Sequence, residues 1–270
     1  MTTRGLALGG GGITGIAWET GLLHGLAEAG VDLTAADRIV GTSAGSIVGA
    51  QLISGIALDD LYRRQCEPPG SASVDGTVRV AAIGLGVVVR FGISLLRARG
   101  DVERFGRLLG ASAVKASANG ATPSVDERYE QVAIRIGGIR WNDRDLRVTA
   151  VDVETGELVT FGPYGDRPEV PLEDAVNASC AVPCVYPPIP IDERLFIDGG
   201  AHSRANAHLM AGCDPVIALT PVDRSIGPSR SAKQQLAELG VQHLVIRPDA
   251  AAVAAIGKNV LDPAARPGSA

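Results

Sequence analysis

A serine stands between two glycines directly after a short apolar stretch, in the run Gly41-Thr42-Ser43-Ala44-Gly45. The preceding Arg38-Ile39-Val40 can form a strand, and residues 46–53 can form a helix. A strand that turns this sharply into a helix forces the serine into a strained backbone conformation and leaves room only for small neighbours. The pattern is typical of a nucleophile elbow, with an exposed hydroxyl and a serine N–H placed at a helix N-terminus to meet an oxyanion. A tight Gly/Ser turn in an α/β protein is the alternative at this point.

A second strand–turn–helix unit comes earlier in the chain. Residues 4–8 predict a strand, Gly9-Gly10-Gly11-Gly12 follows it, and a helix is expected from about Ile13 to Ala29. Two such units in succession predict a parallel sheet with crossover helices. We expect the two strands to be neighbours, so that the loops after them meet in one crevice.

The glycine loop can be interpreted in two ways. Gly10-x-Gly12-x-x-Gly15 matches a dinucleotide-binding fingerprint, but the second strand ends in Gly41-Thr42-Ser43 where a ribose-binding carboxylate is expected. The alternative is that the N–H groups of Gly11 and Gly12 face the same carbonyl as Ser43 and donate to an oxyanion. Two independent features at one sheet edge favour the enzyme.

The rest of the chain predicts one domain over residues 4–246, with a helical cap or insertion at about 68–121, and a C-terminal helix and frayed tail over 247–270. Regular structure resumes after the insertion with two strands joined by a turn, and a strand–helix–strand order returns over residues 215–246. The expected strands cover 146–153, 158–161, 195–197, 215–219 and 241–246, and the expected helices cover 172–181 and 231–239.

Composition and charge exclude several function classes. The 270 residues carry 25 Lys and Arg against 30 Asp and Glu, a formal charge of −5, which argues against nucleic acid as a partner. The apolar stretch from Val80 to Val89 is too short to span a bilayer. With no signal peptide recognisable at the N-terminus, we expect a cytoplasmic protein. The four cysteines have neither zinc nor disulfide spacing, and we expect them to be reduced and packed.

A serine nucleophile needs a base, and two candidates are open. The order Ser43, Asp198, His202 copies that of α/β-hydrolases, although four residues is an unusually short separation for two triad members. Asp198 is the better candidate, because it ends a predicted strand and Gly199-Gly200 leaves its approach unblocked. Desolvation beside an apolar site would raise the pKa of this carboxyl and make it a better base. The alternative for Asp198 is an ordinary Asx-turn.

Taken together, these residues resemble the patatin-like phospholipase family. The resemblance extends from about Leu6 to Asn206. It rests on ordered blocks: Gly9-Gly10-Gly11-Gly12 with Gly15, Gly41 to Gly45, Ala178-Ser179 with Pro183, and Asp198-Gly199-Gly200 with Asn206.

The resemblance implies a three-layer α/β/α fold and hydrolysis of lipid or other acyl esters through an acyl-serine, without a metal or cofactor. The family uses a Ser–Asp dyad, which corresponds to Ser43 and Asp198. Its oxyanion loop corresponds to Gly10, Gly11 and Gly12. One departure is Thr14, which stands where the family usually has Arg or Lys.

The insertion bears on substrate access. A helix here would place Val88, Phe91 and Leu95 on one face and Arg90, Ser94 and Arg97 on the other. Such a helix could rest on anionic lipid as a peripheral membrane contact or act as a lid, and the alternative is a cap helix with solvated arginines. The glycines in this segment favour the cap. The sequence does not indicate the oligomeric state.

Overall fold

The computed structural model describes residues 3–69, 84–222 and 227–270, and its described strands form one eight-stranded sheet in the order β5-β6-β3-β2-β1-β7-β8, with β4 beside β3. Strands β1, β2, β3, β7 and β8 run parallel, as the sequence predicts, and β4, β5 and β6 run antiparallel to their neighbours. The strands are β1 (Gly5–Leu8), β2 (Arg38–Thr42), β3 (Asp145–Asp152), β4 (Leu158–Phe161), β5 (Ile189–Ile191), β6 (Arg194–Asp198), β7 (Val216–Leu219) and β8 (His243–Ile246).

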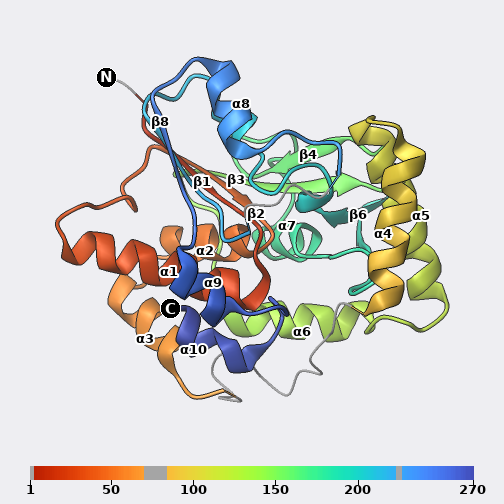
Figure 1. Cartoon of the computed structure of the whole chain (residues 1–270), viewed down its shortest axis with the longest axis horizontal. Coiled ribbons are helices and arrows are strands. Elements are labelled where there is room, and N and C mark those ends of the chain that lie inside the picture. Colours follow the sequence, from red (N-terminus) through yellow and green to blue (C-terminus); the bar gives the residue numbers. More distant parts are fainter. Residues whose placement is uncertain (1–2, 70–83, 223–226) are drawn as a thin grey trace.

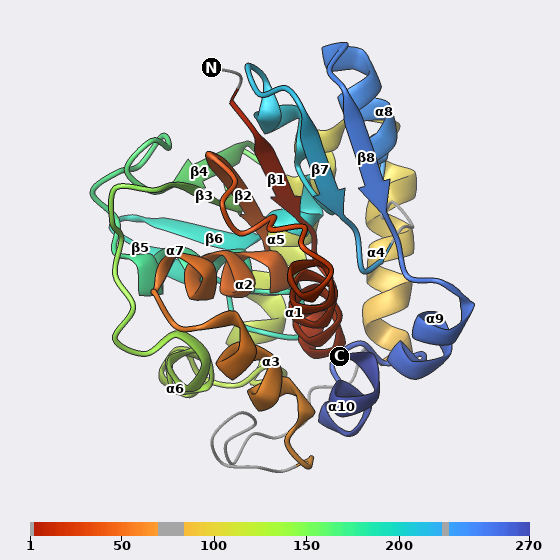
Figure 2. The same ribbon diagram turned by 90° about the vertical axis from the view of Figure 1, so that its left-hand side faces the viewer.

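Helices cover both faces of this sheet, which confirms the three-layer α/β/α architecture (Figures 1 and 2). Helices α1, α2 and α7 lie on one face with α6 outside them, and α5 and α8 lie on the other, with α4 packed on the outside of α5. The helices are α1 (Gly12–Glu28), α2 (Ala44–Ile53), α3 (Leu58–Cys66), α4 (Leu85–Ala98), α5 (Val102–Ala118), α6 (Val125–Ile136), α7 (Leu172–Ser179), α8 (Ala232–Leu239), α9 (Ala250–Ile256) and α10 (Arg266–Ser269).

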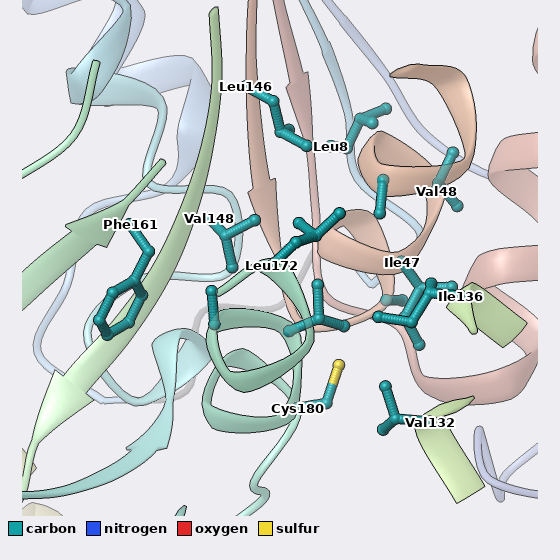
Figure 3. Packing of buried hydrophobic residues seen from close by; sticks show 14 of the residues in the cluster. Leu8, Ile47, Val48, Val132, Ile136, Leu146, Val148, Phe161, Leu172 and Cys180 are labelled. Carbon is teal, nitrogen blue, oxygen red and sulfur yellow. The ribbon is translucent and has the colours of Figure 1, made fainter. Parts of the chain in front are cut away.

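The main hydrophobic core lies between the sheet and the α1, α2, α6 and α7 layer (Figure 3). Successive strand residues point to opposite faces of the sheet. Leu8 therefore packs against this core, whereas its neighbour Ala7 belongs to a smaller cluster on the α8 side. A third cluster joins Phe105 of α5 to Val151 of β3. Each fully buried Leu or Phe contributes about 1.5–3 kcal/mol, so both faces of the sheet hold the layers together.

Helix α6 is not among the predicted elements, although the sequence carries a signal for it. The Ser124 hydroxyl accepts a hydrogen bond from the Glu127 N–H at 3.1 Å, and the Glu127 carboxylate accepts one from the Ser124 N–H at 2.7 Å. This reciprocal capping box satisfies two backbone donors at the start of the helix. The motif Ser-x-x-Glu before an apolar periodic run would have identified α6.

The prediction of a frayed tail within residues 247–270 is wrong. Arg266 is 1% exposed and donates to the carbonyls of Arg64 and Gln65 at 2.7 Å each. Further back, the Val260 carbonyl accepts a hydrogen bond from the Thr14 N–H at 3.1 Å. The segment is ordered because one buried guanidinium satisfies the carbonyls at the end of α3, which local sequence patterns do not reveal.

Helix α4 confirms the helical character of the insertion but turns a different face inward from the one expected; residues 70–83 of that insertion lie outside the described residues. Its more buried side consists of Val87, Phe91, Ser94 and Ala98, of which Phe91 and Ala98 pack with Phe105 of α5. Val88 and Leu95, expected to share a face with Phe91, are 55% and 42% exposed. Small side chains at Ser94 and Ala98 let the two helix backbones approach, so packing selects this stripe over the more apolar one.

The cysteines agree in part with expectation. All four are free thiols, and Cys180, Cys184 and Cys213 are buried. Cys66 is exposed at the end of α3, so the prediction that all four are packed is wrong at this position.

Candidate active site

Three neighbouring strands bring Ser43 and Asp198 together. Thr42, the last residue of β2, pairs with Thr149 of β3, and the next β3 residue pairs with Asp198 at the end of antiparallel β6. The residues that follow β2 and end β6 therefore flank the same point of β3. Gly199 is required here, because a Cβ on it would lie 2.4 Å from the Thr149 hydroxyl oxygen.

Ser43 has the backbone conformation expected of an elbow, with φ 53° and ψ −115°. A non-glycine residue in this region is strained and persists only where its surroundings fix it. A Cβ on Gly41 would lie 2.6 Å from the Gly45 carbonyl oxygen, and one on Gly45 would lie 2.2 Å from the Leu8 carbonyl oxygen. These contacts confirm that only glycine fits beside the turn.

The backbone N–H of Ser43 has a different role from the one expected. It donates to the Ser179 hydroxyl oxygen at 2.9 Å, so Ser179 at the end of α7 holds the elbow from behind. The Ser43 carbonyl accepts from the Ser46 hydroxyl at 2.6 Å. The Ser43 N–H is therefore engaged within the protein and does not face a substrate.

Asp198 is 5% exposed, and its carboxylate accepts a hydrogen bond from the Gly200 N–H at 2.7 Å. Burial raises the pKa of the Asp198 carboxyl above its usual range, and the nearby Ser43 hydroxyl, the Gly200 N–H and the charge of Arg204 oppose the rise. The direction agrees with the sequence expectation, because desolvation disfavours the charged carboxylate. The pair thus unites a hydroxyl with a carboxylate of increased basicity.

The glycine loop lies beside this pair, and a Cβ on Gly10 would be 3.4 Å from the Ser43 Cβ. The Gly10 N–H donates to the Arg204 carbonyl at 2.8 Å. The N–H groups of Gly11 and Gly12 have no acceptor among residues 3–69, 84–222 and 227–270. Of the three glycines predicted as oxyanion donors, Gly11 and Gly12 therefore have free N–H groups within this described part of the chain, and the Gly10 N–H is engaged.

A cavity of about 420 Å³ opens onto these groups. Its walls include apolar side chains of α4 and two cations, Arg204 and Lys258. A second space of about 50 Å³ also reaches Ser43 and is mainly apolar, with Ile16, Ile47 and Val132 among its lining residues. Ser43 is thus reached from two sides, as both halves of an ester require.

His202 is not joined to this pair. Its Nδ1 lies 2.9 Å from the Asn206 side-chain oxygen, and the structure gives it no hydrogen bond to Ser43 or Asp198 within the described part of the chain. Burial lowers the pKa of His202. Asn206 in turn donates to the Thr42 hydroxyl at 3.0 Å and ties the loop after Asp198 to the end of β2. His202 therefore supports this loop.

Glu19 is a site residue that the sequence interpretation missed. It is fully buried in α1, and its Oε1 accepts from the Gly9 N–H at 2.8 Å. Its Oε2 has no partner among the described residues, and burial raises the pKa of this carboxyl well above its usual range. Glu19 lies three residues after Ile16 and four before Leu23, so a carboxylic acid on the buried stripe of α1 was the available signal.

Comparison with known proteins identifies the family. The family model of patatin-like phospholipases matches residues 6–211. The chain belongs to the patatin-like phospholipase family. No curated protein matches it. Among solved structures, VipD from Legionella pneumophila is similar with 16% identity and a TM-score of 0.45, over 81% of this chain and 50% of that one. The type III effector protein ExoU is similar with 18% identity and a TM-score of 0.35, over 99% and 52%. The chain thus spans about half the length of each.

Within this patatin-like fold, the Thr14 departure has a structural counterpart. The Thr14 side chain is fully buried, and its hydroxyl donates to the Val260 carbonyl oxygen at 3.3 Å. A Cβ on Gly12 would be 2.6 Å from that same carbonyl oxygen. The C-terminal segment therefore lies over the glycine loop beside Thr14. Family membership supports lipid acyl hydrolase activity in general.

Proposed function

We propose that this protein is a serine hydrolase that cleaves carboxylic ester bonds of lipids by way of an acyl-Ser43 intermediate, with Asp198 as its base. The observation that carries the proposal is the meeting of Ser43 with the buried Asp198 carboxylate on one cavity of about 420 Å³. Such a pair provides both parts of an activated nucleophile, a hydroxyl and a neighbouring base.

Acylation follows from the positions of these groups. Asp198 accepts the hydroxyl proton as the Ser43 oxygen attacks the ester carbonyl carbon. The carbonyl oxygen becomes an oxyanion and receives hydrogen bonds from the N–H groups of Gly11 and Gly12, and each such donor is worth about 3–4 kcal/mol in the transition state. The carbon–oxygen bond to the alcohol then breaks, and the alcohol takes the proton from Asp198.

Deacylation repeats these steps with water. Asp198, again ionised, removes a proton from a water molecule that attacks the acyl-Ser43 carbonyl. The same oxyanion donors act, and the proton returns from Asp198 to the Ser43 oxygen as the carboxylic acid leaves. One carboxylate thus serves as base and acid in both halves of the reaction, and no histidine takes part.

A fluorophosphonate probe tests the nucleophile. Mass spectrometry should locate its adduct on Ser43 in the folded protein, and Ser43→Ala should remove both labelling and turnover of a short-chain lipid ester. Asp198→Asn should lower kcat by about a thousandfold or more. Asp152→Asn is the matched control, because it removes another buried carboxylate of the sheet that does not line the cavity. Labelling at another residue, or an equal loss of kcat in both aspartate variants, would refute the proposal.

We further propose that α4 rests on a lipid surface when substrate enters. Val88 lines the cavity and is 55% exposed, and Leu85 and Leu96 on the same helix are each 80% exposed. Exposed apolar side chains that continue an apolar cavity wall mark an interaction surface. None of the helices in the described ranges is long and apolar enough to cross a membrane. This contact would therefore lie in the plane of the interface.

Vesicle flotation tests this contact. Replacing Leu85 and Leu96 together by Ser should lower the fraction bound to anionic vesicles, and reversing the charges of Arg90 and Arg97 should do the same. Leu244→Ser is the control, because Leu244 is 56% exposed but belongs to β8. Unchanged vesicle binding in both α4 variants would contradict a lipid contact.

A further inference from the structure

Arg204 places a positive charge in the cavity beside Ser43 and Asp198 without an ion-pair partner among the described residues. Its buried Nε has no acceptor within these parts of the chain. One terminal nitrogen of its guanidinium lies 3.8 Å from the point that a Cβ on Gly10 would occupy. The charge of Arg204 acts on Asp198, but the two form no salt bridge. The guanidinium therefore stands next to the reacting atoms with a buried donor unused.

A guanidinium with an unpartnered buried donor costs folding free energy unless a ligand binds it. A buried guanidinium loses hydration, and its planar fork of donors matches the oxygens of a carboxylate or phosphate. Arg128, a buried arginine that lines the smaller space beside Ser43, likewise has an Nε without an acceptor among the described residues. Its terminal nitrogens, however, donate to the Gln131 side chain and the Cys180 carbonyl at 3.2 Å each. The terminal nitrogens of Arg204 have no such bond to a described residue, so they remain available to a ligand in the cavity.

A second cation lines the same cavity. Lys258 is exposed there and forms no ion pair with any described residue. Asp198 is the one acidic residue among those that line the cavity in the described part of the chain, and the Gly200 N–H already bonds to it at 2.7 Å. Two cations against one engaged carboxylate give the cavity an excess of positive charge, which attracts an anionic ligand.

We infer that Arg204 and Lys258 select esters whose leaving-group half carries an anion of the phosphate type, bound in the cavity of about 420 Å³. The apolar side chains of α4 would contact the remainder of that amphiphilic group. This inference rests on the proposed hydrolase function and adds the two residues that determine its substrate preference.

Arg204 could instead act only by stabilising the ionised Asp198, and a ratio of rates separates the two roles. A merely electrostatic aid to Asp198 would change the turnover of every ester by the same factor. A specificity residue changes the ratio of kcat/KM for an anionic ester to that for a neutral ester with the same acyl chains.

The first measurement compares dioctanoyl phosphatidic acid with dioctanoylglycerol. We expect the wild-type protein to favour the anionic ester, and we expect Arg204→Met to reduce that preference by about tenfold to a hundredfold, the range for losing a charge-assisted hydrogen bond. Lys258→Met should reduce it less, because Lys258 is exposed and screened. The exposed Arg140→Met is the control and should leave the preference unchanged. A wild-type protein without preference, or an unchanged ratio in Arg204→Met, would overturn the inference.

The second measurement is independent of turnover. Calorimetry of octyl phosphate binding to Ser43→Ala should show affinity that falls by about tenfold or more when Arg204→Met is added. Octanol should bind both proteins equally. Arg204→Lys, which keeps the charge, should give an intermediate affinity, and it remains informative if Arg204→Met fails to fold. If the wild-type protein hydrolyses neither ester while octyl phosphate binding still depends on Arg204, the hydrolase proposal fails and the anion site stands. Equal binding by all variants refutes the anion site.

Discussion

Replacing Gly45 by Ala tests whether the elbow is held by its packing against β1. A Cβ at this position would lie 2.2 Å from the Leu8 carbonyl oxygen and 2.4 Å from the Leu8 carbonyl carbon. Both atoms belong to the backbone of β1, which is paired on each side with β2 and β7. The neighbour therefore cannot yield by changing a rotamer, and the first turn of α2 must move.

The expected cost follows from that displacement. Regular contacts between carbon and carbonyl oxygen are no shorter than about 3.3 Å, so α2 must shift by about 1 Å. Overpacking that side chains can absorb costs about 1–3 kcal/mol. Here the shift also stretches the hydrogen bond from the Gly45 N–H to the Gly9 carbonyl, 3.1 Å long, which is worth about 0.5–1.5 kcal/mol. We expect Gly45→Ala to lose about 3 kcal/mol or more of unfolding free energy.

Activity should fall further than stability alone explains. The bond between Gly45 and Gly9 couples the elbow to the glycine loop, so moving α2 alters the distance from Ser43 to the N–H groups of Gly11 and Gly12. A displacement of about 1 Å between reacting groups can lower a rate by about a hundredfold. Fluorophosphonate labelling under conditions where the variant remains folded measures this loss.

Gly25→Ala is the matched control, because Gly25 also lies in a helix but has no heavy atom within 4 Å of the position that its Cβ would take. Adding that methyl should stabilise α1 by about 0.5–1 kcal/mol. Urea denaturation followed by tryptophan fluorescence gives both values, since Trp18 is buried in α1. A loss below about 1 kcal/mol in Gly45→Ala, with Gly25→Ala behaving as expected, would refute the packing argument.

Three further outcomes follow from the buried acids and the histidine. Because Asp198 must be ionised to act and burial raises its pKa, kcat/KM should fall on the acid side at a pH above the ordinary aspartate value of about 3.9. His202→Ala should leave this acid-side fall of kcat/KM in place and keep kcat within about threefold of the wild-type value. A large loss of kcat would instead support a Ser–His–Asp triad. The folded protein keeps the Glu19 proton that the unfolded chain releases, so this residue's contribution to stability is lost as pH rises above about 4.5, by up to about 1.4 kcal/mol per pH unit. Glu19→Gln removes that dependence, and its unfolding free energy relative to wild type should rise between about pH 5 and pH 7; a constant difference would show that Glu19 is ionised in the fold.

The strands β1, β2 and β6 were predictable because short apolar runs that end at glycines specify them locally. Parallel pairing brings the loops after β1 and β2 to one edge, but Asp198 meets Ser43 through the register of antiparallel β6 on β3, which no local signal specifies. The elbow glycines Gly41 and Gly45 were also predictable from local sequence, because the sharp turn leaves room only for small residues. The buried face of α4 was not predictable from its own pattern, because the small side chains of Ser94 and Ala98 matter only once α5 lies beside them.

Which glycine N–H groups are free to donate to an oxyanion could not be predicted from the glycine motif. Four consecutive glycines offer four equivalent N–H groups in the sequence, yet the fold distinguishes them by what approaches from elsewhere. Glu19 and Leu219 take the Gly9 N–H, and the Arg204 carbonyl takes that of Gly10. The Val260 carbonyl lies over Gly12 but accepts from the Thr14 N–H, so the N–H groups of Gly11 and Gly12 remain free among the described residues. Selection of the donors therefore depends on residues up to about 250 positions away, and that choice is a property of the tertiary structure rather than of the glycine motif.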